Sequence, residues 1–444
     1  MLKAGIYSLG CPRNLVDSEI IAGSLKSNGF TICEAEDGVD ICVINTCAFI
    51  ESAREESVDK IMQAARLKKE GKIKYLIVCG CLPQLYKEKL AKELSEADLL
   101  LGTNDFKDLP GLIKRLGIGP TRTHVGRSLN YIYDERDPRL SLTPKHYAYV
   151  KISEGCSNAC SYCIISRLRG RFRSRPIASI VNEVKQLSRP GVLKEINLIG
   201  QDTTFFGHDR YGKLKLAKLL GGICRLDNSV RWIRILYTHP KHYTDELIST
   251  IAREEKICKY LDIPVQHISD NILKKMNRGV SRRNIEDLIE KIRERIPGVI
   301  LRTSIIVGFP GERDKDFNEL LKFINDTKFE RLGAFTYSKE EGTLSAKLKD
   351  QIPDEVKSER FDALMKLQRS ISEKVLRRSI GKTLEVLVDE KCEDERNKFV
   401  GRTQGDAPEI DGVVYVSGHN IKVGEFYNVM ITDSVEYDLI GERA

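Results

Sequence analysis

The chain has 444 residues, 41% of them hydrophobic, and carries a formal net charge of +8. This length is too great for one ordinary core, so the sequence predicts two to three domains. No apolar run approaches the ~20 residues that span a bilayer, and the first residues lack the apolar segment of a secretory signal. We therefore expect a cytoplasmic protein with no membrane contact. The mild positive charge permits an RNA or ribosome partner without establishing one.

Residues 2–118 alternate short apolar runs with helix-like stretches. The alternation lies at 4–9, 15–27, 41–45, 53–67 and 75–78. Strand and helix in alternation predict an open parallel sheet covered by helices. Three of the expected strands end in a loop that carries a cysteine, namely Cys11, Cys47 and Cys81. Because ligands bind at the carboxyl ends of the strands in such sheets, we expect these cysteines to converge.

Residues 119–144 are polar and rich in Arg, Asp and Pro, which predicts a linker. From 145 to 378 the alternation resumes with six strand candidates. The strands are expected at 147–152, 195–199, 232–236, 260–264, 300–307 and 332–336, and helices at 178–187, 214–224, 244–254, 282–293 and 315–325. Six such units with right-handed crossovers predict a partial barrel whose active site lies at the carboxyl ends of its strands.

The remaining segments complete the predicted domain order. Residues 354–379 predict one long amphipathic helix that leads out of the barrel. Residues 379–444 hold about five short runs of alternating hydrophobicity separated by Gly and Asp, which predicts a small all-β barrel. The chain is therefore expected to be an α/β protein with domains at 2–118, 145–378 and 379–444.

Twelve cysteines in a reducing compartment are poor candidates for disulfides, so their spacing is tested first against metal ligation. Cys156, Cys160 and Cys163 form a CxxxCxxC triplet directly after the first expected barrel strand. Three thiolates from one loop are one short of the four that close a common four-iron cluster, whereas zinc sites usually show two paired CxxC elements. The triplet therefore favours a 4Fe-4S cluster with one open iron over a structural zinc site.

An open iron can chelate the amino and carboxylate groups of S-adenosylmethionine. One electron from the cluster then cleaves the carbon–sulfur bond and gives a 5′-deoxyadenosyl radical. The cofactor supplies the chemistry of such a reaction, and the protein supplies position and exclusion of water. The triplet thus predicts an enzyme of the radical S-adenosylmethionine class.

Cys11, Cys47 and Cys81 have a simpler explanation as buried core thiols, because free Cys is among the most buried residue types. Their shared place in strand-to-helix loops favours a second open cluster instead. The remaining cysteines lack that placement and are expected in the core, although one of them lies beside Cys81 in the sequence. They are Cys33, Cys42, Cys79, Cys224, Cys258 and Cys392.

Six segments together resemble the methylthiotransferase family, and the resemblance covers nearly the whole chain. They are SLGCPRNLVDSE at 8–19, NTCAFIESA at 45–53, GCLPQ at 80–84, EGCSNACSYCII at 154–165, RTSIIVGFPGE at 302–312 and DAPEIDG at 406–412. The first and the last resemble the branch that modifies an aspartate of a ribosomal protein, not the branch that modifies tRNA. The chain departs from the usual pattern at Arg13, where Lys is common, and at Ser166, where Pro is common.

The resemblance implies an N-terminal methylthiotransferase domain, a radical barrel and a C-terminal TRAM domain. It implies that a methylthio group is placed on the β-carbon of one aspartate in small-subunit ribosomal protein twelve, free or in the assembled subunit. One S-adenosylmethionine would methylate a sulfur on an auxiliary cluster, and a second would be cleaved to the radical. A reducing flavodoxin or ferredoxin type protein is the expected electron donor. By motif, the auxiliary 4Fe-4S cluster is held by Cys11, Cys47 and Cys81, and the radical-generating one by Cys156, Cys160 and Cys163.

Five further side chains are expected to contact S-adenosylmethionine. Tyr162 lies inside the triplet and is expected beside the adenine. Gln201 and Asp202 end the second barrel strand, where the methionine end should bind. Gln266 and Arg302 are expected as polar contacts from later strands. The alternative for each is a strand cap or a surface ion pair.

Two other features leave alternatives open. The arginine-rich run at 167–176 is either a solvated face or a contact to ribosomal RNA or an acidic substrate edge, since Arg binds phosphate and carboxylate bidentately. His239 and His267 follow the third and fourth barrel strands. Neither is given a role, because a lone His at such a place is more often a structural hydrogen-bonding residue.

Two other functions compete. Methylthiolation of an adenosine in tRNA would use the same clusters, but a nucleic-acid reader should present a basic barrel with aromatic platforms. The last domain instead carries many acids, which favours a basic protein partner and makes nucleic-acid contact secondary. They include Glu385, Asp389, Glu390, Glu393, Asp394, Glu395, Asp406, Glu409 and Asp411. A non-catalytic RNA-binding module with zinc is the second competitor, and analysis for iron and zinc separates it from the enzyme.

Overall fold

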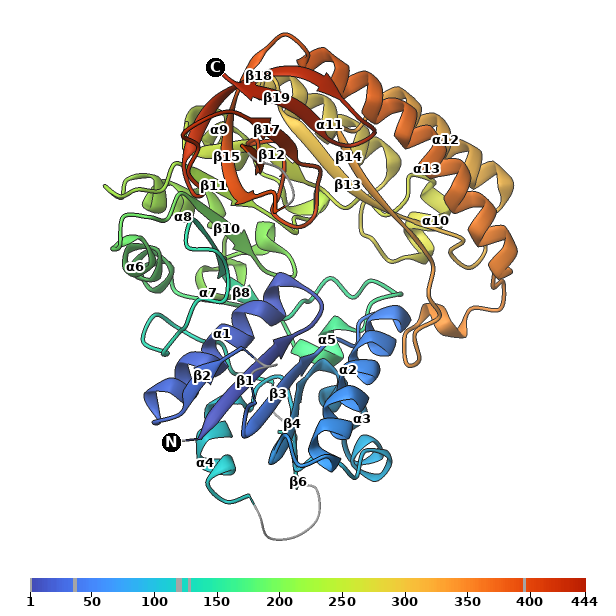
Figure 1. The fold of residues 1–444 in the computed structure, drawn as a ribbon. Coiled ribbons are helices and arrows are strands. Elements are labelled where there is room, and N and C mark those ends of the chain that lie inside the picture. Colours follow the sequence, from blue (N-terminus) through green and yellow to red (C-terminus); the bar gives the residue numbers. More distant parts are fainter. Residues whose placement is uncertain (1, 35–37, 117–121, 127–128, 394–396) are drawn as a thin grey trace.

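The computed structural model describes residues 2–34, 38–116, 122–126, 129–393 and 397–444. Figure 1 shows an N-terminal α/β unit in blue, a central barrel in green to orange, and a small red barrel against the central one. Within the described ranges, the helices all lack the length and apolar character needed to cross a membrane. Residues 119–121 and 127–128 of the predicted linker, and Asp394 and Glu395, lie outside the described residues.

The N-terminal unit is built on a six-stranded parallel sheet in the order β2-β1-β3-β4-β5-β6. Its elements are β1 (Lys3–Ser8), α1 (Pro12–Ser27), β2 (Thr31–Cys33), β3 (Ile41–Thr46), α2 (Glu51–Lys69), β4 (Tyr75–Gly80), α3 (Cys81–Glu93), β5 (Leu99–Leu101), α4 (Leu109–Ile113) and β6 (Arg122–His124). Strand β3 is buried throughout and β4 is buried after Tyr75, because helices cover both faces of the sheet, with α1 and α4 on one and α2 and α3 on the other. Strand β6 falls in the segment predicted as a linker and pairs with β5.

The central unit is an open six-stranded parallel sheet in the order β14-β13-β12-β11-β10-β7. The strands are β7 (Tyr147–Lys151), β10 (Glu195–Ile199), β11 (Trp232–Ile235), β12 (Ile257–Asp262), β13 (Ile300–Val307) and β14 (Arg331–Thr336). Six longer helices cover its outer face and form the largest apolar core, namely α6 (Ile177–Ser188), α8 (Leu216–Cys224), α9 (Asp245–Arg253), α11 (Arg282–Arg295), α12 (Asp314–Thr327) and α13 (Asp354–Leu376). The predicted partial barrel is confirmed.

Several short helices and strands lie at the mouth of this barrel. A two-stranded hairpin of β8 (Ser153–Glu154) and β9 (Arg173–Ser174) encloses the cysteine loop and α5 (Ile165–Arg169). Two more short helices, α7 (His208–Tyr211) and α10 (Asp270–Lys275), follow β10 and β12. These elements are too short to have been recognised by periodicity.

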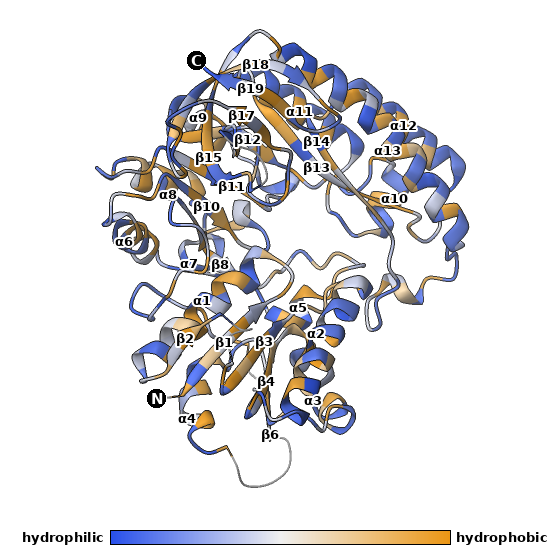
Figure 2. Cartoon of the chain, in the orientation of Figure 1, coloured by the Kyte–Doolittle hydropathy of each residue, from blue (hydrophilic) through white to orange (hydrophobic). Residues whose placement is uncertain are grey.

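The C-terminal unit is a closed barrel in the order β15-β16-β17-β19-β18, as the alternating pattern predicted. Its strands are β15 (Thr383–Lys391), β16 (Lys398–Arg402), β17 (Val414–Ser417), β18 (Phe426–Ser434) and β19 (Leu439–Arg443). Figure 2 shows apolar strands in all three units and polar outer helix faces around the central one. The α/β class with a small all-β barrel at the end of the chain is therefore confirmed.

The inner face of the central sheet joins the three units. Tyr149 and Tyr260, on β7 and β12, belong to a buried cluster that also holds Val16 of α1 and Ala407 of the C-terminal unit. Successive residues of a strand face opposite sides, so the strands give aliphatic residues to the outer core and aromatic or charged ones to this inner face. The three units therefore share one core at the centre of the molecule.

Candidate active site between two cysteine triplets

Three loops at the carboxyl edge of the N-terminal sheet each present one cysteine. Cys11 is the N-cap residue of α1, Cys47 follows β3, and Cys81 is the first residue of α3. Strands β1, β3 and β4 are neighbours, so these loops adjoin. Burial raises the pKa of Cys47 to about 12, and the charges of Cys81 and Cys11 act in the same direction. The structure thus brings the three thiols within electrostatic reach of one another.

Two glycines make room for this first triplet. Gly10 has φ +86°, and a Cβ there would lie 2.6 Å from Cβ of Cys47 and 2.8 Å from its Sγ. Gly80 has φ +95°, and a Cβ there would lie 2.4 Å from Oδ1 of Asn45. A positive φ favours Gly because it has no Cβ to clash. Conformation and space together therefore exclude any side chain at both positions.

An asparagine network ties the same loops together. Nδ2 of Asn14 donates to the carbonyls of Leu9 and Thr46 at 3.0 and 2.9 Å. Nδ2 of Asn45 donates to the carbonyl of Asn14 at 2.8 Å and to Oγ of Ser18 at 2.9 Å. Because both amides are buried, these bonds fix the loops after β1 and β3 relative to each other.

The second triplet lies in the loop between β8 and α5. The backbone N–H of Cys156 donates to the carbonyl of Gly170 at 3.1 Å, and that of Cys163 to the carbonyl of Cys160 at 3.1 Å. Burial raises the pKa of Cys156 to about 11 and that of Cys163 to about 12. All three thiols are free and partly exposed. The loop therefore presents three sulfurs at the mouth of the barrel without sealing them in the core.

Arg13 of α1 connects the two triplets. Its Nε donates to Sγ of Cys11 at 3.4 Å, and its Nη1 donates to the carbonyl of Gly200, after β10, at 3.0 Å. Burial raises the pKa of Cys163, and the charge of Arg13 acts in the opposite direction. For Cys11, burial also acts to raise the pKa, but Arg13 and Arg169 outweigh it and lower the pKa. Arg13 therefore links the first triplet to the barrel mouth, where the loop of the second triplet lies.

A buried ion network fixes the N-terminal unit on the barrel beside the triplets. Nζ of Lys151 lies 2.5 Å from Oδ1 of Asp17 and 2.6 Å from Oε2 of Glu154. Arg169 pairs with Asp17 and donates to Sγ of Cys81 at 3.6 Å. Burial acts to raise the pKa of Glu154, but Lys151 and Arg169 lower it to about 2. Loss of one partner would leave an uncompensated buried charge, so the network enforces a single arrangement of the two units.

Asp202 is fully engaged in hydrogen bonds. Its Oδ2 accepts from Nδ2 of Asn158 at 2.7 Å and pairs with Nδ1 of His242 at 2.8 Å. Its Oδ1 accepts from the hydroxyl of Thr204 at 2.7 Å and the backbone N–H of Phe205 at 3.1 Å. A carboxylate has about four lone-pair sites. The carboxylate oxygens of Asp202 therefore accept hydrogen bonds from Asn158 in the cysteine loop and from the turn that follows Asp202.

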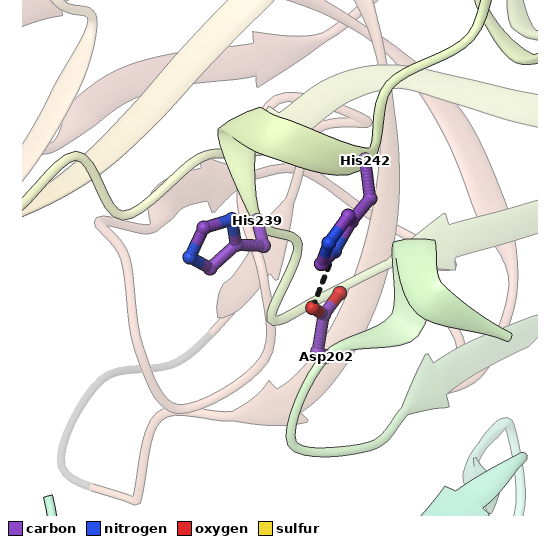
Figure 3. Close-up of side chains that lie close together, drawn as sticks. All are labelled: Asp202, His239 and His242. Carbon is purple, nitrogen blue, oxygen red and sulfur yellow. Dashed lines mark hydrogen bonds and ion pairs between the residues drawn. The ribbon is translucent and has the colours of Figure 1, made fainter. Parts of the chain in front are cut away.

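His239 and His242 gather with Asp202 at the carboxyl ends of β10 and β11 (Figure 3), and their ligand atoms lie within 4.8 Å of one another. Nδ1 of His239 accepts the backbone N–H of Lys241 at 3.2 Å. Burial lowers the pKa of His239 to about 2, with Arg278 acting in the same direction, so the ring is neutral and Nε2 carries the proton. His239 then has no free lone pair, and the group is a hydrogen-bonding network, not a metal site.

Gln201 and Gln266 lie at the carboxyl ends of barrel strands. Nε2 of Gln201 donates to Oε1 of Glu154 at 2.6 Å, whereas its buried Oε1 has no partner among the residues that the structure describes. Gln266 has φ +72° and its backbone bridges to Ile305 of β13. Both side chains remain predicted contacts to S-adenosylmethionine.

Arg302 and Tyr162 have protein partners in the structure. Arg302 pairs with Asp262 at 2.9 Å and with Asp411 of the C-terminal unit at 3.3 Å. Tyr162 packs against an apolar cluster behind the cysteine loop that includes Met276. Their proximity to the cofactor stays a prediction. His267 is wholly buried and its Nδ1 accepts a backbone N–H from Ser269, which agrees with the structural role expected for it.

The acids of the C-terminal unit correct one argument from the sequence. Asp406 accepts from Nε of Arg331 at 3.0 Å, Asp411 accepts from the hydroxyl of Tyr260 at 2.7 Å, and Glu409 accepts from that of Tyr147 at 2.9 Å. Asp389 pairs with His146, directly before β7, and Glu385 pairs with Arg231. Glu390 and Glu393 are exposed. Most of the acidity therefore docks the small barrel on the central one and does not mark a surface for a basic partner.

The arginine run at 167–176 divides by burial. Arg169 and Arg175 are buried, and Arg175 pairs with Glu183. Arg167 and Arg171 are exposed. Two of the five arginines therefore serve the core of the barrel mouth, two form a solvated face of limited charge, and Arg173 is intermediate.

Sequence reasoning assigned no function to Arg13, Asn14 or Arg278. Arg278 donates from Nη1 to Sγ of Cys160 at 3.7 Å. Asn14 belongs to the NLVDSE segment, so the motif itself carried a signal for it. Arg13 and Arg278 make contacts with residues distant in the sequence, and no local sequence pattern predicts such contacts.

This geometry defines a class of protein. A partial parallel barrel with a CxxxCxxC loop at the carboxyl end of its first strand is a radical S-adenosylmethionine enzyme, here flanked by an α/β unit with a second cysteine triplet and by a small β-barrel. Residues 150–324 match the family described as the Radical SAM superfamily, and residues 380–443 that described as the TRAM domain. Residues 3–102 match the family described as Uncharacterized protein family UPF0004.

Full-length relatives narrow the class. The chain is 48% identical over 446 residues to the ribosomal protein uS12 methylthiotransferase RimO of Clostridioides difficile (strain 630), with 100% of this chain and 99% of the relative covered. It is 46% identical to the protein of the same name from Geobacter sulfurreducens, with 99% and 98% covered. The chain belongs to the family of ribosomal protein uS12 methylthiotransferases.

Solved structures of lower identity share the fold. The radical S-adenosylmethionine methyltransferase TsrM from Kitasatospora setae, with tryptophan and a cofactor analogue bound, is 15% identical with a TM-score of 0.54, covering 75% of this chain and 73% of that chain. The cobalamin-dependent radical enzyme OxsB is 12% identical with a TM-score of 0.52, covering 83% and 56%. At these identities the likeness extends to the fold alone.

Proposed function

We propose that this chain methylthiolates the β-carbon of an aspartate in ribosomal protein uS12. The chain is a radical S-adenosylmethionine methylthiotransferase by family, and relatives that match its whole length are named for uS12. The observation that carries the proposal is that Arg13 links one cysteine triplet to the barrel mouth that presents the other. Two cysteine-held groups are required when one generates a radical and the other holds the sulfur.

The residues present fit two 4Fe-4S clusters. Each triplet offers three free thiols, which leaves one iron of a cubane open. In the first triplet, Cys47 packs directly against Gly10, where a Cβ would lie 2.8 Å from Sγ of Cys47. Beside the second, the buried Oε1 of Gln201 and Nε2 of His239 have no partners among the described residues. We assign Cys11, Cys47 and Cys81 to the auxiliary cluster and Cys156, Cys160 and Cys163 to the radical-generating one.

When bound, the clusters and S-adenosylmethionine supply a 5′-deoxyadenosyl radical and a methylthio sulfur. The chain's own residues keep the two triplets in a fixed relation, because Lys151 and Arg169 join the barrel mouth to Asp17 of α1. These three side chains are less than a tenth exposed, so the junction also excludes water. Asp202 holds the cysteine loop through Asn158.

Several parts of the proposal concern partners and boundaries. Gln201 is favoured as a contact to S-adenosylmethionine because its Oε1 is an unused acceptor for an ammonium group, while Tyr162, Asp202, Gln266 and Arg302 stay predictions. A flavodoxin or ferredoxin type protein is proposed as the electron donor, and the cytoplasm as the location of a reaction on a ribosomal protein. The domains are proposed at 2–118, 145–378 and 379–444, with a linker at 119–144.

An adenosine in tRNA is the competing substrate. It is not favoured, because the full-length relatives are named for uS12. An RNA-binding module with structural zinc is likewise not favoured, since the chain matches the Radical SAM superfamily over residues 150–324.

Mass spectrometry of uS12 and of bulk tRNA from cells that lack the gene tests the proposal. We expect uS12 to lose the mass of one methylthio group while the tRNA modifications stay unchanged. Expression of the wild-type gene should restore the group, and expression of a Cys47→Ala variant should not. A fully modified uS12 in the deletion strain would refute the proposal.

A further inference from the structure

Among the described arginines near the two triplets, Arg13 and Arg278 form no ion pair with a carboxylate, and Arg278 instead donates to Sγ of Cys160. Arg169, Arg175, Arg234 and Arg402 each pair with a carboxylate. Within the part of the chain that the structure describes, no ion pair to an Asp or Glu is formed by Arg13, although it lies at the junction of two units. Arg13 is partly buried, and a cation withdrawn from water without a carboxylate partner is costly unless an anion is supplied from elsewhere.

The guanidinium of Arg13 is held in place with part of its edge unused. It has five N–H donors, of which one on Nε goes to Cys11 and one on Nη1 goes to Gly200. Its face lies on the ring of Tyr237, with 4.4 Å between Cζ and the ring centroid. Among the described residues, the second N–H of Nη1 and both N–H groups of Nη2 have no protein acceptor. Adjacent N–H groups on Nη1 and Nη2 match the two oxygens of a carboxylate.

Arg13 lies between the first triplet and the barrel mouth that carries the second triplet. Its guanidinium contacts Cys11 of the first triplet and the carbonyl of Gly200 at the end of β10. Two residues further on, Asp202 accepts from Asn158 in the loop of the second triplet. A substrate atom that receives sulfur from one side after losing hydrogen to the other must come between the triplets. A group bound by Arg13 therefore lies close to the carbon that reacts.

We infer that Arg13 binds the side-chain carboxylate of the substrate aspartate, an inference that rests on the proposed function. That carboxylate is one bond from the β-carbon, so a bidentate contact to a fixed guanidinium orients the carbon that loses hydrogen. An adenine base offers no anion to this site. Arg13 is thus a specificity-determining residue that selects an acidic side chain. The contact with Cys11 alone would make it a counter-charge for the first triplet, and the experiment separates the two roles.

The test measures the dissociation constant of labelled uS12 from anaerobically reconstituted enzyme. Two forms of uS12 are compared, one with the natural target aspartate and one in which that residue is Asn. Wild-type enzyme should bind the Asp form about 10- to 100-fold more tightly, because a hydrogen-bonded charge pair is lost in the other. In Arg13→Gln the two dissociation constants should come within about threefold of each other. Arg283→Gln, at a residue whose side chain is 88% exposed, removes the same charge far from the site and should leave the discrimination intact.

Iron content and the electron paramagnetic resonance spectra of both clusters are recorded for each variant. Tyr237→Leu is the second variant, because it removes the ring under the guanidinium and leaves Cys11 and Arg13 in place. It should lower the discrimination at least about threefold. If Arg13→Gln loses iron, the Tyr237 variant decides the question.

Unchanged discrimination in either iron-replete variant would overturn the inference. If wild-type enzyme methylthiolates uS12 in the same preparation, the proposed function stands and only the role of Arg13 fails. If wild-type enzyme leaves uS12 unmodified, the proposed function fails first.

Discussion

Gly10→Ala is expected to remove the auxiliary cluster and spare the radical-generating one. An added Cβ would lie 2.6 Å from Cβ of Cys47 and 2.8 Å from its Sγ, where ordinary contact begins at 3.4 Å. The loop must therefore shift by about 1 Å, which exceeds the ~0.5 Å tolerance of a functional constellation. The φ of +86° adds a backbone cost of about 1 to 3 kcal/mol for a residue with a Cβ.

Gly29→Ala is the matched control. Gly29 has φ +89°, but a Cβ there meets nothing within 4 Å. Its variant should carry the same backbone cost of about 1 to 3 kcal/mol and lose no cysteine ligand. A comparison of the two variants therefore separates strain from collision with Cys47.

Iron analysis, optical spectra and cleavage of S-adenosylmethionine to 5′-deoxyadenosine are measured on both variants. Iron should fall from about eight to about four per chain in Gly10→Ala and stay at about eight in Gly29→Ala. Cleavage should continue in both, whereas methylthiolation should be lost in the first. Retention of about eight irons and of methylthiolation by Gly10→Ala would refute the reasoning.

Three further predictions address the sulfur donor, the docking of the small barrel and the acid limb of stability. Cys47→Ala should abolish methylthiolation of uS12 while 5′-deoxyadenosine still forms; survival of methylthiolation would contradict the two-cluster scheme. Asp406→Asn leaves Arg331 without its carboxylate partner and should lower the free energy of unfolding by about 3 kcal/mol. Urea denaturation measures this free energy, and a change near zero would disprove the docking role. His239 takes a proton near pH 6.5 when unfolded but at about 2 when folded, so the free energy of unfolding should fall below pH 6.5 by up to about 1.4 kcal/mol per pH unit from this residue. His239→Gln should flatten that decline, and parallel stability curves would count against the buried neutral ring.

Local patterns predicted most of the fold because each strand and helix of the two sheets carries its own periodicity. The strand predicted at 260–264 shows where this fails, since β12 begins at Ile257. The charge of Lys259 hides the strand, yet its Nζ donates to carbonyls of Ala252 and Glu254 at the end of α9. A cation at a helix carboxyl end is stabilised by the helix dipole, and only tertiary packing reveals that partner.

The site divides in the same way. The CxxxCxxC spacing is local, and the place of Cys81 after a strand was enough to separate it from Cys79, which the structure puts in the core beneath α1. The contact between Arg13 and Gly200 spans 187 positions, and that between Lys151 and Asp17 spans 134. No window along the chain contains both members of such a pair. The sequence could therefore predict which cysteines form each triplet. It could not predict the long-range contacts that hold the two triplets in a fixed relation.

The acidity of the C-terminal unit shows why a charge count does not identify a partner. Such a count treats every carboxylate as if it faced water. Arg234 of β11 and Arg331 of β14 lie on the inner face of the barrel, where an unpaired cation is costly. The small barrel supplies a carbonyl to Arg234 from Gln404 and a carboxylate to Arg331 from Asp406.

These contacts make the small barrel a plug in the inner face of the large one, on the side where the strands begin. Substrate selection must then lie where the strands end. There Arg13 donates to the carbonyl of Gly200, and its positive charge has no carboxylate partner among the described residues. The side chains that distinguish an aspartate from a nucleobase are therefore expected beside the clusters. An enzyme in which the exposed acidic residues of the C-terminal unit are replaced by basic ones should still modify uS12, provided that the docking pairs are kept.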